Sequence, residues 1–213
     1  NHIDLFARQI DVIFDVAEKQ NFTVFIDTAY HGFAESLEDD AYMAREAVLR
    51  LPSALISYSC SKNFGIYRER TGALIAVGES AERAQALVSH MTSLARGMYS
   101  MPPGHGGLIV SKILHDTDLS AMWRSELADM REAVIGNREL LVKAAQEMQL
   151  GDQLDFITSQ RGMFSMLPVT KEQTEIFREK HGIYMTGDGR INMCGVNTGN
   201  VEALVAAYKD VAL

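Results

Sequence analysis

A single lysine follows an apolar run in the stretch SYSCSKNFG, residues 57–65. The run Ala-Leu-Ile at residues 54–56 is typical of a strand buried on both faces, and serines at positions 57, 59 and 61 precede Lys62. Burial disfavours the ammonium form of a lysine, and a free amine can attack a carbonyl carbon to form an imine. The alternative is a surface loop whose lysine points into water, because lysines are rarely buried.

A carboxylate follows another apolar run. Residues 22–26, Phe-Thr-Val-Phe-Ile, lead to Asp27, and Tyr30 follows in the segment IDTAYHGF. Ligands of parallel α/β sheets bind beyond the carboxyl ends of the strands, so we expect Asp27 and Lys62 at one edge of a sheet. A carboxylate beside apolar residues is costly unless a positive group faces it. Asp27 is therefore either a helix or loop cap or the partner of a cation.

These residue types match what pyridoxal 5'-phosphate requires. The cofactor needs an amine that forms an imine, an acid beside its ring nitrogen and a compact anion site for its phosphate. Lys62 and Asp27 supply the first two. The hydroxyls of Ser59 and Ser61, with the guanidinium of Arg70, supply the third.

The elements that position these residues alternate between strands and helices up to residue 78, where the pattern changes to helices. We expect helices over residues 5–20, 41–50, 81–98 and 106–115, and strands over residues 22–26, 54–58 and 72–78. Such alternation implies parallel pairing in an α/β layered sheet. Helix signals then run over residues 119–150, and a helix of that length often passes between domains. A small α+β unit follows, with strands at residues 156–158, 163–167, 183–185 and 190–194 and helices at residues 171–181 and 200–211.

Composition narrows the class of protein. The chain has 213 residues, of which 47% are hydrophobic, so it can bury a substantial core. Its formal net charge of -8 provides no basic field for nucleic acid or an anionic membrane, and we expect neither as a partner. Cys60 and Cys194 match no disulfide framework and no metal-ligand spacing, so we expect free thiols, no metal site and a cytoplasmic location.

The motifs resemble one family. SYSCSKNFGIYRERTG is similar to the lysine motif S-x-S-K-N-F-G-x-Y-x-E-R of the aspartate and aromatic amino-acid aminotransferases, fold type I enzymes that use pyridoxal phosphate, and IDTAYHGF resembles their D-x-A-Y-x-G-F segment. LARGMYSMPPGHG, WRSELADMR, RGMFSM and GRINMCG follow in the family's order, so the likeness covers essentially the whole chain. It implies the C-terminal part of a large domain with a three-layer, mostly parallel sheet over residues 1–125. A small α+β domain over residues 126–213 is joined to it through a long helix.

The resemblance also implies roles for the residues of a cofactor site. Lys62 is the imine-forming lysine and the base that moves the α-proton. Asp27 pairs with the pyridinium nitrogen and Tyr30 with the phenolic oxygen of the cofactor. The phosphate is held by Ser59, Ser61 and Arg70.

Substrate recognition is implied at three further positions. Arg190 binds the α-carboxylate, Arg96 reaches across a dimer interface to the side-chain carboxylate of a substrate in the neighbouring subunit, and Phe164 walls the pocket. Without the family pattern, Arg190 reads equally well as an exposed arginine at a turn and Arg96 as part of a solvated helix face. Met98 and Met101 provide an apolar lining beside Arg96, which widens tolerance for aromatic side chains.

The implied activity is ping-pong transamination between aspartate, or an aromatic amino acid, and 2-oxoglutarate in a homodimer whose active sites lie at the subunit interface. The likeness omits roughly the N-terminal half of the family's chain, so the fragment alone is expected to be weak or inactive. Two alternatives are a pyridoxal-phosphate-dependent decarboxylase or lyase on the same fold, and a non-catalytic dimerisation or binding fragment of such an enzyme.

Overall fold

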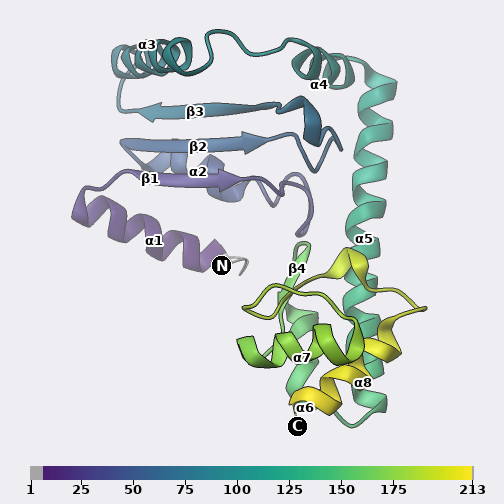
Figure 1. Cartoon of the computed structure of the whole chain (residues 1–213). Helices are drawn as coiled ribbons and strands as arrows, with labels where there is room; N and C mark the ends of the chain where they lie inside the picture. The colour runs from purple at the N-terminus through teal and green to yellow at the C-terminus, as the bar shows by residue number, and fades with distance from the viewer. Residues whose placement is uncertain (1–6, 213) are drawn as a thin grey trace. The chain divides into compact units, whose positions relative to one another are not determined.

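The computed structural model describes residues 7–212. The chain divides into two compact units, one up to residue 128 and one from residue 129, and the long helix α5 (Thr117–Glu147) contains this boundary (Figure 1). The first expected helix is present as α1 (Ala7–Gln20), and residues 5 and 6 of that expectation lie outside the described residues. None of the helices in the described part of the chain has the length and apolar character that a membrane crossing needs.

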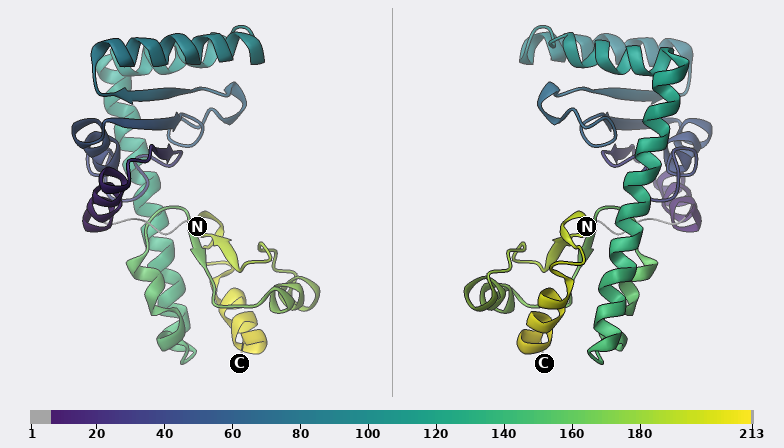
Figure 2. Two further views of the ribbon diagram at one scale, coloured as in Figure 1. Left: turned by 90° about the vertical axis from the view of Figure 1, so that its left-hand side faces the viewer. Right: turned by 90° about the vertical axis from the view of Figure 1, so that its right-hand side faces the viewer.

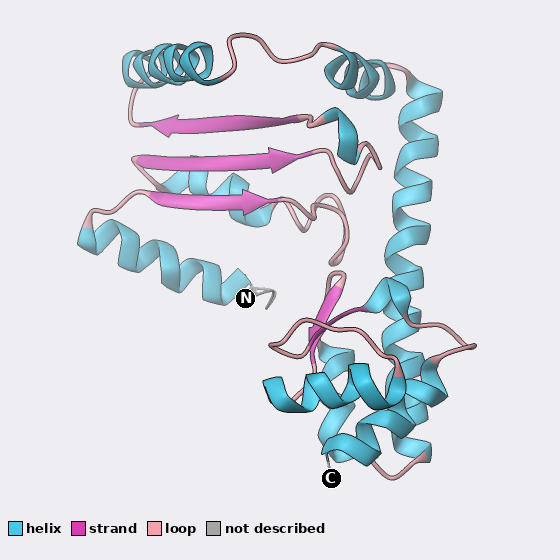
Figure 3. Cartoon of the chain, in the orientation of Figure 1, coloured by secondary structure: helices cyan, strands magenta, loops and turns pink. Residues whose placement is uncertain are grey.

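The first unit is built on a sheet of three strands in the order β1 (Val24–Thr28), β2 (Ser53–Ser59), β3 (Gly72–Gly78), drawn as magenta arrows in Figure 3. β1 and β2 are parallel, as the alternation predicts. β3 is antiparallel to β2, so only one of the two pairings is parallel. The reason is the connection: residues 60–71 contain only the short 3-10 helix η1 (Tyr67–Glu69), whereas a parallel pairing needs a long crossover, usually a helix.

One face of this sheet is covered by α1 and α2 (Tyr42–Arg50), which lie on the same side of the strands (Figure 2). Phe14 of α1 and Ala47 of α2 are fully buried against Ile26 and Ile56 of the strands. Strand side chains alternate between faces, and on the opposite face Phe25 is 63% exposed. The described chain therefore leaves apolar surface of the sheet open to solvent.

Two more helices of the first unit, α3 (Ala81–Met98) and α4 (His105–His115), lie beyond the β3 edge in Figure 1. α3 begins at Ser80, whose hydroxyl accepts a hydrogen bond from the backbone N–H of Arg83 at 3.1 Å, an ordinary N-cap. The bounds of α3 match the sequence prediction, and α4 begins one residue earlier than predicted.

The second unit packs helices around a small two-stranded sheet. After α5 come α6 (Gly151–Leu154), the 3-10 helix η2 (Asp155–Ser159), β4 (Phe164–Met166), α7 (Lys171–His181), β5 (Arg190–Asn192), the 3-10 helix η3 (Met193–Gly195) and α8 (Val201–Ala212). β4 and β5 are antiparallel. Ile157, Phe177, Met193 and Val205 are fully buried in its core.

Two predicted strands of this unit are wrong. Residues 156–158 form part of η2, because the Thr158 and Ser159 hydroxyls bond the carbonyls three residues back and stabilise a local turn. Residues 183–185 form no strand in the described chain. The N–H of Ile183 donates instead to the Phe177 carbonyl at 3.0 Å, and so closes the end of α7 after Gly182, whose φ is 64°.

Candidate active site

Lys62 lies in the turn directly after β2, and its side chain is half-buried. Its Nζ lies 4.5 Å from the centroid of the Tyr30 ring, within the range of a cation–π contact. The turn is closed by the N–H of Gly65, which donates to the Lys62 carbonyl at 3.1 Å with Gly65 at a φ of 66°. The amine of Lys62 is therefore held over an aromatic face rather than extended into solvent.

Asp27 reaches the same edge of the sheet because β1 and β2 are parallel and in register. It pairs with Ser57, whose hydroxyl donates to Asp27 Oδ1 at 3.5 Å. The carboxylate of Asp27 is exposed in the described chain. Asp27, Tyr30 and Lys62 thus follow the carboxyl ends of two adjacent parallel strands, where α/β folds bind ligands.

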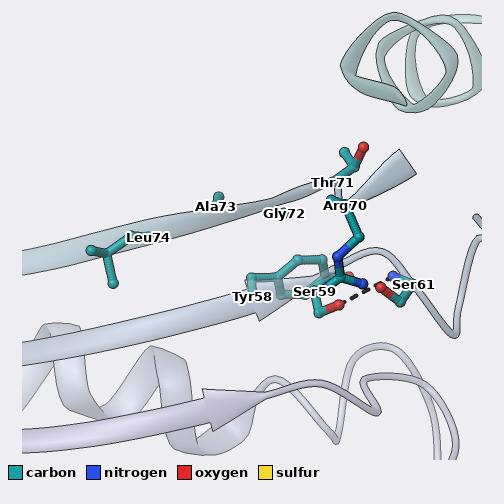
Figure 4. Close-up of a pocket in the computed structure, with 8 residues that line it drawn as sticks. All are labelled: Tyr58, Ser59, Ser61, Arg70, Thr71, Gly72, Ala73 and Leu74. Carbon is teal, nitrogen blue, oxygen red and sulfur yellow. Dashed lines mark hydrogen bonds between the residues drawn. The ribbon is translucent and has the colours of Figure 1, made fainter. Parts of the chain in front are cut away.

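A pocket of about 310 Å³ lies between the ends of β2 and β3. Figure 4 shows the side chain of Arg70 extending toward Ser59 and Ser61 in this pocket. Ser61 is buried, and its backbone N–H donates to the Ser59 hydroxyl at 3.2 Å. Arg70 has a φ of 51°, in the left-handed region, and its Nη1 donates to the Tyr67 carbonyl at 3.0 Å.

The donor set of this pocket fits a phosphate group. Two hydroxyls and an exposed guanidinium gather in a small open space, and guanidinium groups bind phosphate oxygens through charge-assisted hydrogen bonds. The sequence predicted Ser59, Ser61 and Arg70 together, and the structure brings them together.

Arg190 and Phe164 lie together in the second unit. The guanidinium carbon of Arg190 is 5.2 Å from the centroid of the Phe164 ring, and both residues belong to the two-stranded sheet of β4 and β5. They line an open groove of about 660 Å³ with the apolar side chains of Ile183, Met185 and Leu204. The arrangement offers a cation to a carboxylate and an aromatic wall to the group attached to it.

The loop before Arg190 is ordered by Asp188. The Asp188 carboxylate accepts hydrogen bonds from the Thr186 hydroxyl and from the Arg190 backbone N–H. The Thr186 bond is the main cause that lowers the pKa of Asp188, so the carboxylate stays ionised beside Arg190.

Arg96 belongs to none of the site segments described so far. It lies in the last turn of α3, and its side chain is exposed. Met98 and Met101 are 73% and 79% exposed. Within the described residues, no hydrogen bond or ion pair holds the Arg96 side chain. Its predicted role depends on a second subunit.

Sequence reasoning missed Arg138, which is 1% exposed within α5. Its guanidinium donates to the carbonyls of Gly162 at 2.7 Å and Phe164 at 2.8 Å, and to the Ser165 hydroxyl at 2.5 Å. The segment that carries Phe164 is therefore held by a buried cation. The sequence contains one indication of this burial: Arg138 lies on an apolar helix face between Val134 and Leu141.

A family model described as aminotransferase class I and II matches residues 3–207. The chain belongs to this family. It is 41% identical over 201 residues to an aromatic-amino-acid aminotransferase of Paracoccus denitrificans, with 94% of this chain and 51% of the relative covered. It is 38% identical over 205 residues to an aspartate aminotransferase of Salmonella typhi, with 96% and 52% covered.

Solved structures of family members agree with this assignment. An aromatic amino acid aminotransferase with 3-indolebutyric acid has a TM-score of 0.95 and 40% identity, over 99% of this chain and 53% of that one. An aromatic-amino-acid aminotransferase from Burkholderia pseudomallei, described as covalently bound to pyridoxal phosphate, has a TM-score of 0.94 and 35% identity, over 99% and 53%. The chain spans about half the length of the curated relatives it matches.

Proposed function

We propose that this chain provides the covalent cofactor lysine and part of the substrate site of a pyridoxal-phosphate-dependent aminotransferase. The amino group moves between aspartate, or an aromatic amino acid, and 2-oxoglutarate. One observation carries the proposal: Lys62 Nζ lies 4.5 Å from the Tyr30 ring at strand ends that also present Asp27 and a pocket lined by Ser59, Ser61 and Arg70. The names of the relatives, some aspartate and some aromatic-amino-acid aminotransferases, support the two substrate classes.

The cofactor phosphate is held by the Ser59 and Ser61 hydroxyls and the Arg70 guanidinium. Asp27 keeps the ring nitrogen protonated, and Tyr30 donates to the phenolic oxygen. When bound, pyridoxal phosphate withdraws electrons from the carbon that loses its proton. One set of residues therefore binds the phosphate of the cofactor, and Asp27 and Tyr30 stabilise charge on its ring.

Lys62 forms the covalent link to the cofactor and afterwards moves the α-proton with its freed Nζ. This second role needs a neutral amine close to the substrate carbon. The Tyr30 ring limits the directions that the side chain can take, and the half-buried position of Lys62 reduces its contact with water. Both features support an amine that is oriented before the substrate arrives.

Substrate binding falls to Arg190, whose planar guanidinium suits two-point binding of the α-carboxylate. Phe164 at 5.2 Å forms one wall beside it. We propose that Arg96 contacts the side-chain carboxylate of a substrate in a neighbouring subunit of a homodimer. The exposed Met98 and Met101 near Arg96 in the sequence then favour acceptance of aromatic side chains as well.

We further propose the architecture of the whole protein. Residues 1–125 are the C-terminal part of a large domain with a three-layer, mostly parallel sheet, and residues 126–213 form a small α+β domain, joined through α5. TM-scores of 0.95 and 0.94 against complete aminotransferases support this architecture. The unpaired thiols of Cys60 and Cys194 suit a reducing, cytoplasmic location.

The exposed sheet face and the coverage of about half of each relative support a site that needs further residues. The 213-residue chain alone is then weak or inactive. A chimera that joins the unmatched half of the Paracoccus denitrificans relative to this chain tests the activity. We expect it to form oxaloacetate from aspartate and 2-oxoglutarate, and a phenyl- or indole-substituted 2-oxo acid from an aromatic amino acid.

The matched variants of the chimera are Lys62→Ala and Lys112→Ala. Lys112 is an exposed lysine of α4 in the same unit. Only Lys62→Ala is expected to abolish product. Release of carbon dioxide without a new amino acid would point instead to a decarboxylase, and normal turnover by Lys62→Ala would refute the assignment.

A further inference from the structure

Three side chains next to Lys62 and Tyr30 form a hydrogen-bonded group that the sequence did not predict. The Tyr58 hydroxyl lies 2.9 Å from His31 Nδ1 and 2.7 Å from Asn63 Nδ2. Asn63 is 1% exposed, and Tyr58 and His31 are half-buried. His31 directly follows Tyr30 in the sequence, and Asn63 directly follows Lys62.

The direction of each hydrogen bond in this group is fixed. His31 Nε2 is 2.7 Å from the Leu37 carbonyl, which can only accept, so Nε2 carries the hydrogen of the neutral ring. Nδ1 is then the acceptor, and the Tyr58 hydroxyl donates to it. Burial raises the pKa of Tyr58, which keeps this hydroxyl protonated.

The amide of Asn63 completes the group. Its Nδ2 donates to the Tyr58 hydroxyl and, at 3.3 Å, to the His31 carbonyl. A flipped amide would place Oδ1 against that carbonyl, so the observed orientation is the favourable one. Oδ1 has no partner in the described part of the chain. Tyr58 is thus the hub that joins the segment after β1 to the turn after β2.

Both ends of the group are anchored elsewhere. The single tryptophan, Trp123 of α5, donates from Nε1 to the Asn63 carbonyl at 2.6 Å, and its ring stacks on Phe64 at 4.5 Å. On the other side, the Asp40 carboxylate accepts from the backbone N–H groups of Gly32 and Ala34 at 2.8 and 3.0 Å. The lysine turn and the loop behind Tyr30 are therefore each fixed, and Tyr58 connects them.

We propose that His31, Tyr58 and Asn63 act as one positioning unit that holds the Lys62 amine over Tyr30 and so speeds capture of the cofactor aldehyde. The effect on aldehyde capture rests on the proposed function, because that function supplies the aldehyde. The effect on the orientation of Lys62 does not depend on it. A lysine side chain has four torsions and can adopt many conformations. Fixing the backbone on both sides of the Lys62–Tyr30 contact reduces the number of conformations that the amine samples before it meets the aldehyde. The Tyr58 hydroxyl couples the two sides through two hydrogen bonds, and the Asn63 amide adds a longer one to the His31 carbonyl.

The test compares Tyr58→Phe with Tyr208→Phe in the 213-residue chain. Both changes remove one hydroxyl that makes a hydrogen bond, but Tyr208 bonds Gln153 at 3.1 Å in the second unit. Loss of the hub bonds is expected to speed amide hydrogen exchange at Phe64 and Gly65 about fivefold in Tyr58→Phe. The emission of Trp123, which bonds the same turn, is expected to shift in Tyr58→Phe and not in Tyr208→Phe.

Capture is measured as the rate of pyridoxal-phosphate label fixed on Lys62 by borohydride. We expect about a fivefold lower rate in Tyr58→Phe, at temperatures where circular dichroism shows both variants folded. Exchange and emission unchanged in Tyr58→Phe, or equally changed in Tyr208→Phe, would overturn the positioning unit. If Lys62 is not labelled in the unsubstituted chain, the proposed function is overturned. The hydrogen-exchange result then decides by itself whether the positioning unit exists.

Discussion

Gly72 of β3 lies directly against the backbone of Tyr58 in β2: a Cβ at position 72 would be 2.2 Å from the Tyr58 carbonyl oxygen. Both residues line the pocket that holds Ser59, Ser61 and Arg70, where β3 and β2 pair through Gly72 and Ser59. The wall of the pocket therefore requires a residue without a side chain at this position.

Replacement of Gly72 by alanine should destabilise the first unit by about 1–3 kcal/mol, because the strand must shift away from a backbone atom. The urea midpoint of the chain measures this. Gly107→Ala is the matched control, since a Cβ on Gly107 within α4 meets nothing within 4 Å. Equal midpoints for the two variants would contradict the close approach.

Arg70→Met should lower the affinity of the chain for inorganic phosphate and for pyridoxal phosphate about tenfold. A hydrogen bond to a charged group contributes about 1.5–3 kcal/mol, and methionine keeps the length of the side chain without the charge. Titration calorimetry gives both affinities. The control Arg68→Met removes the same charge from an exposed position two residues away. An equal loss of affinity in this variant would mean that binding depends on the net charge and not on the position of Arg70.

Arg138→Met should destabilise the second unit by about 3 kcal/mol or more, because several partly buried carbonyls lose a charged donor. Thermal unfolding measures the change. Arg178→Met, which removes an exposed arginine that pairs with its neighbour Glu179 at 3.3 Å, should have little effect. If the two variants unfold alike, the guanidinium of Arg138 is not what holds the Phe164 segment.

The Asp210 carboxylate joins α8 to α7 through Lys180 at 2.5 Å and His181 at 2.9 Å. Mainly the Lys180 bond, and then the His181 bond, lower the pKa of Asp210. A carboxylate with a lowered folded-state pKa stabilises the fold above its unfolded value of about 4 and loses that contribution as the pH falls through the folded-state value.

Urea midpoints should therefore fall more between pH 6 and pH 3 in the unsubstituted chain than in Asp210→Asn. Asp152→Asn, which alters an exposed carboxylate of α6, serves as the control and should follow the unsubstituted chain. A parallel fall in Asp210→Asn would show that the α7–α8 contact does not depend on this charge.

The sequence was sufficient for residues whose position follows from strand order. Lys62 and Asp27 end adjacent parallel strands, and the rule for ligand sites in α/β sheets brings them together without knowledge of packing. Ser59, Ser61 and Arg70 gather for a different reason: β3 is antiparallel to β2, so the start of β3 lies at the end of β2. The sequence predicted this group from its residue types and from the family resemblance, and not from strand direction. The helices α3 and α7 were also predicted with their observed bounds, from clear caps and periodicity.

Features that depend on side-chain packing were not predictable. Arg138 and Asn63 are polar types that are usually exposed, and only the three-dimensional structure shows that backbone carbonyls and a tyrosine hydroxyl pair with them. The antiparallel β3 was missed for another reason: the connection over residues 60–71 is too short for a parallel crossover, and its length was not used in the prediction. Ile183 to Met185 has the residue types of a strand, but its N–H group at Ile183 is used to end α7.

The most direct test of the central claim is the site of covalent labelling. The chain is incubated with pyridoxal 5'-phosphate, reduced with borohydride, digested and mapped by mass spectrometry, together with Lys62→Ala and Lys112→Ala. The account predicts a label concentrated on Lys62, lost in Lys62→Ala and retained in Lys112→Ala. A label spread over the exposed lysines, with Lys62 unmodified, would contradict it.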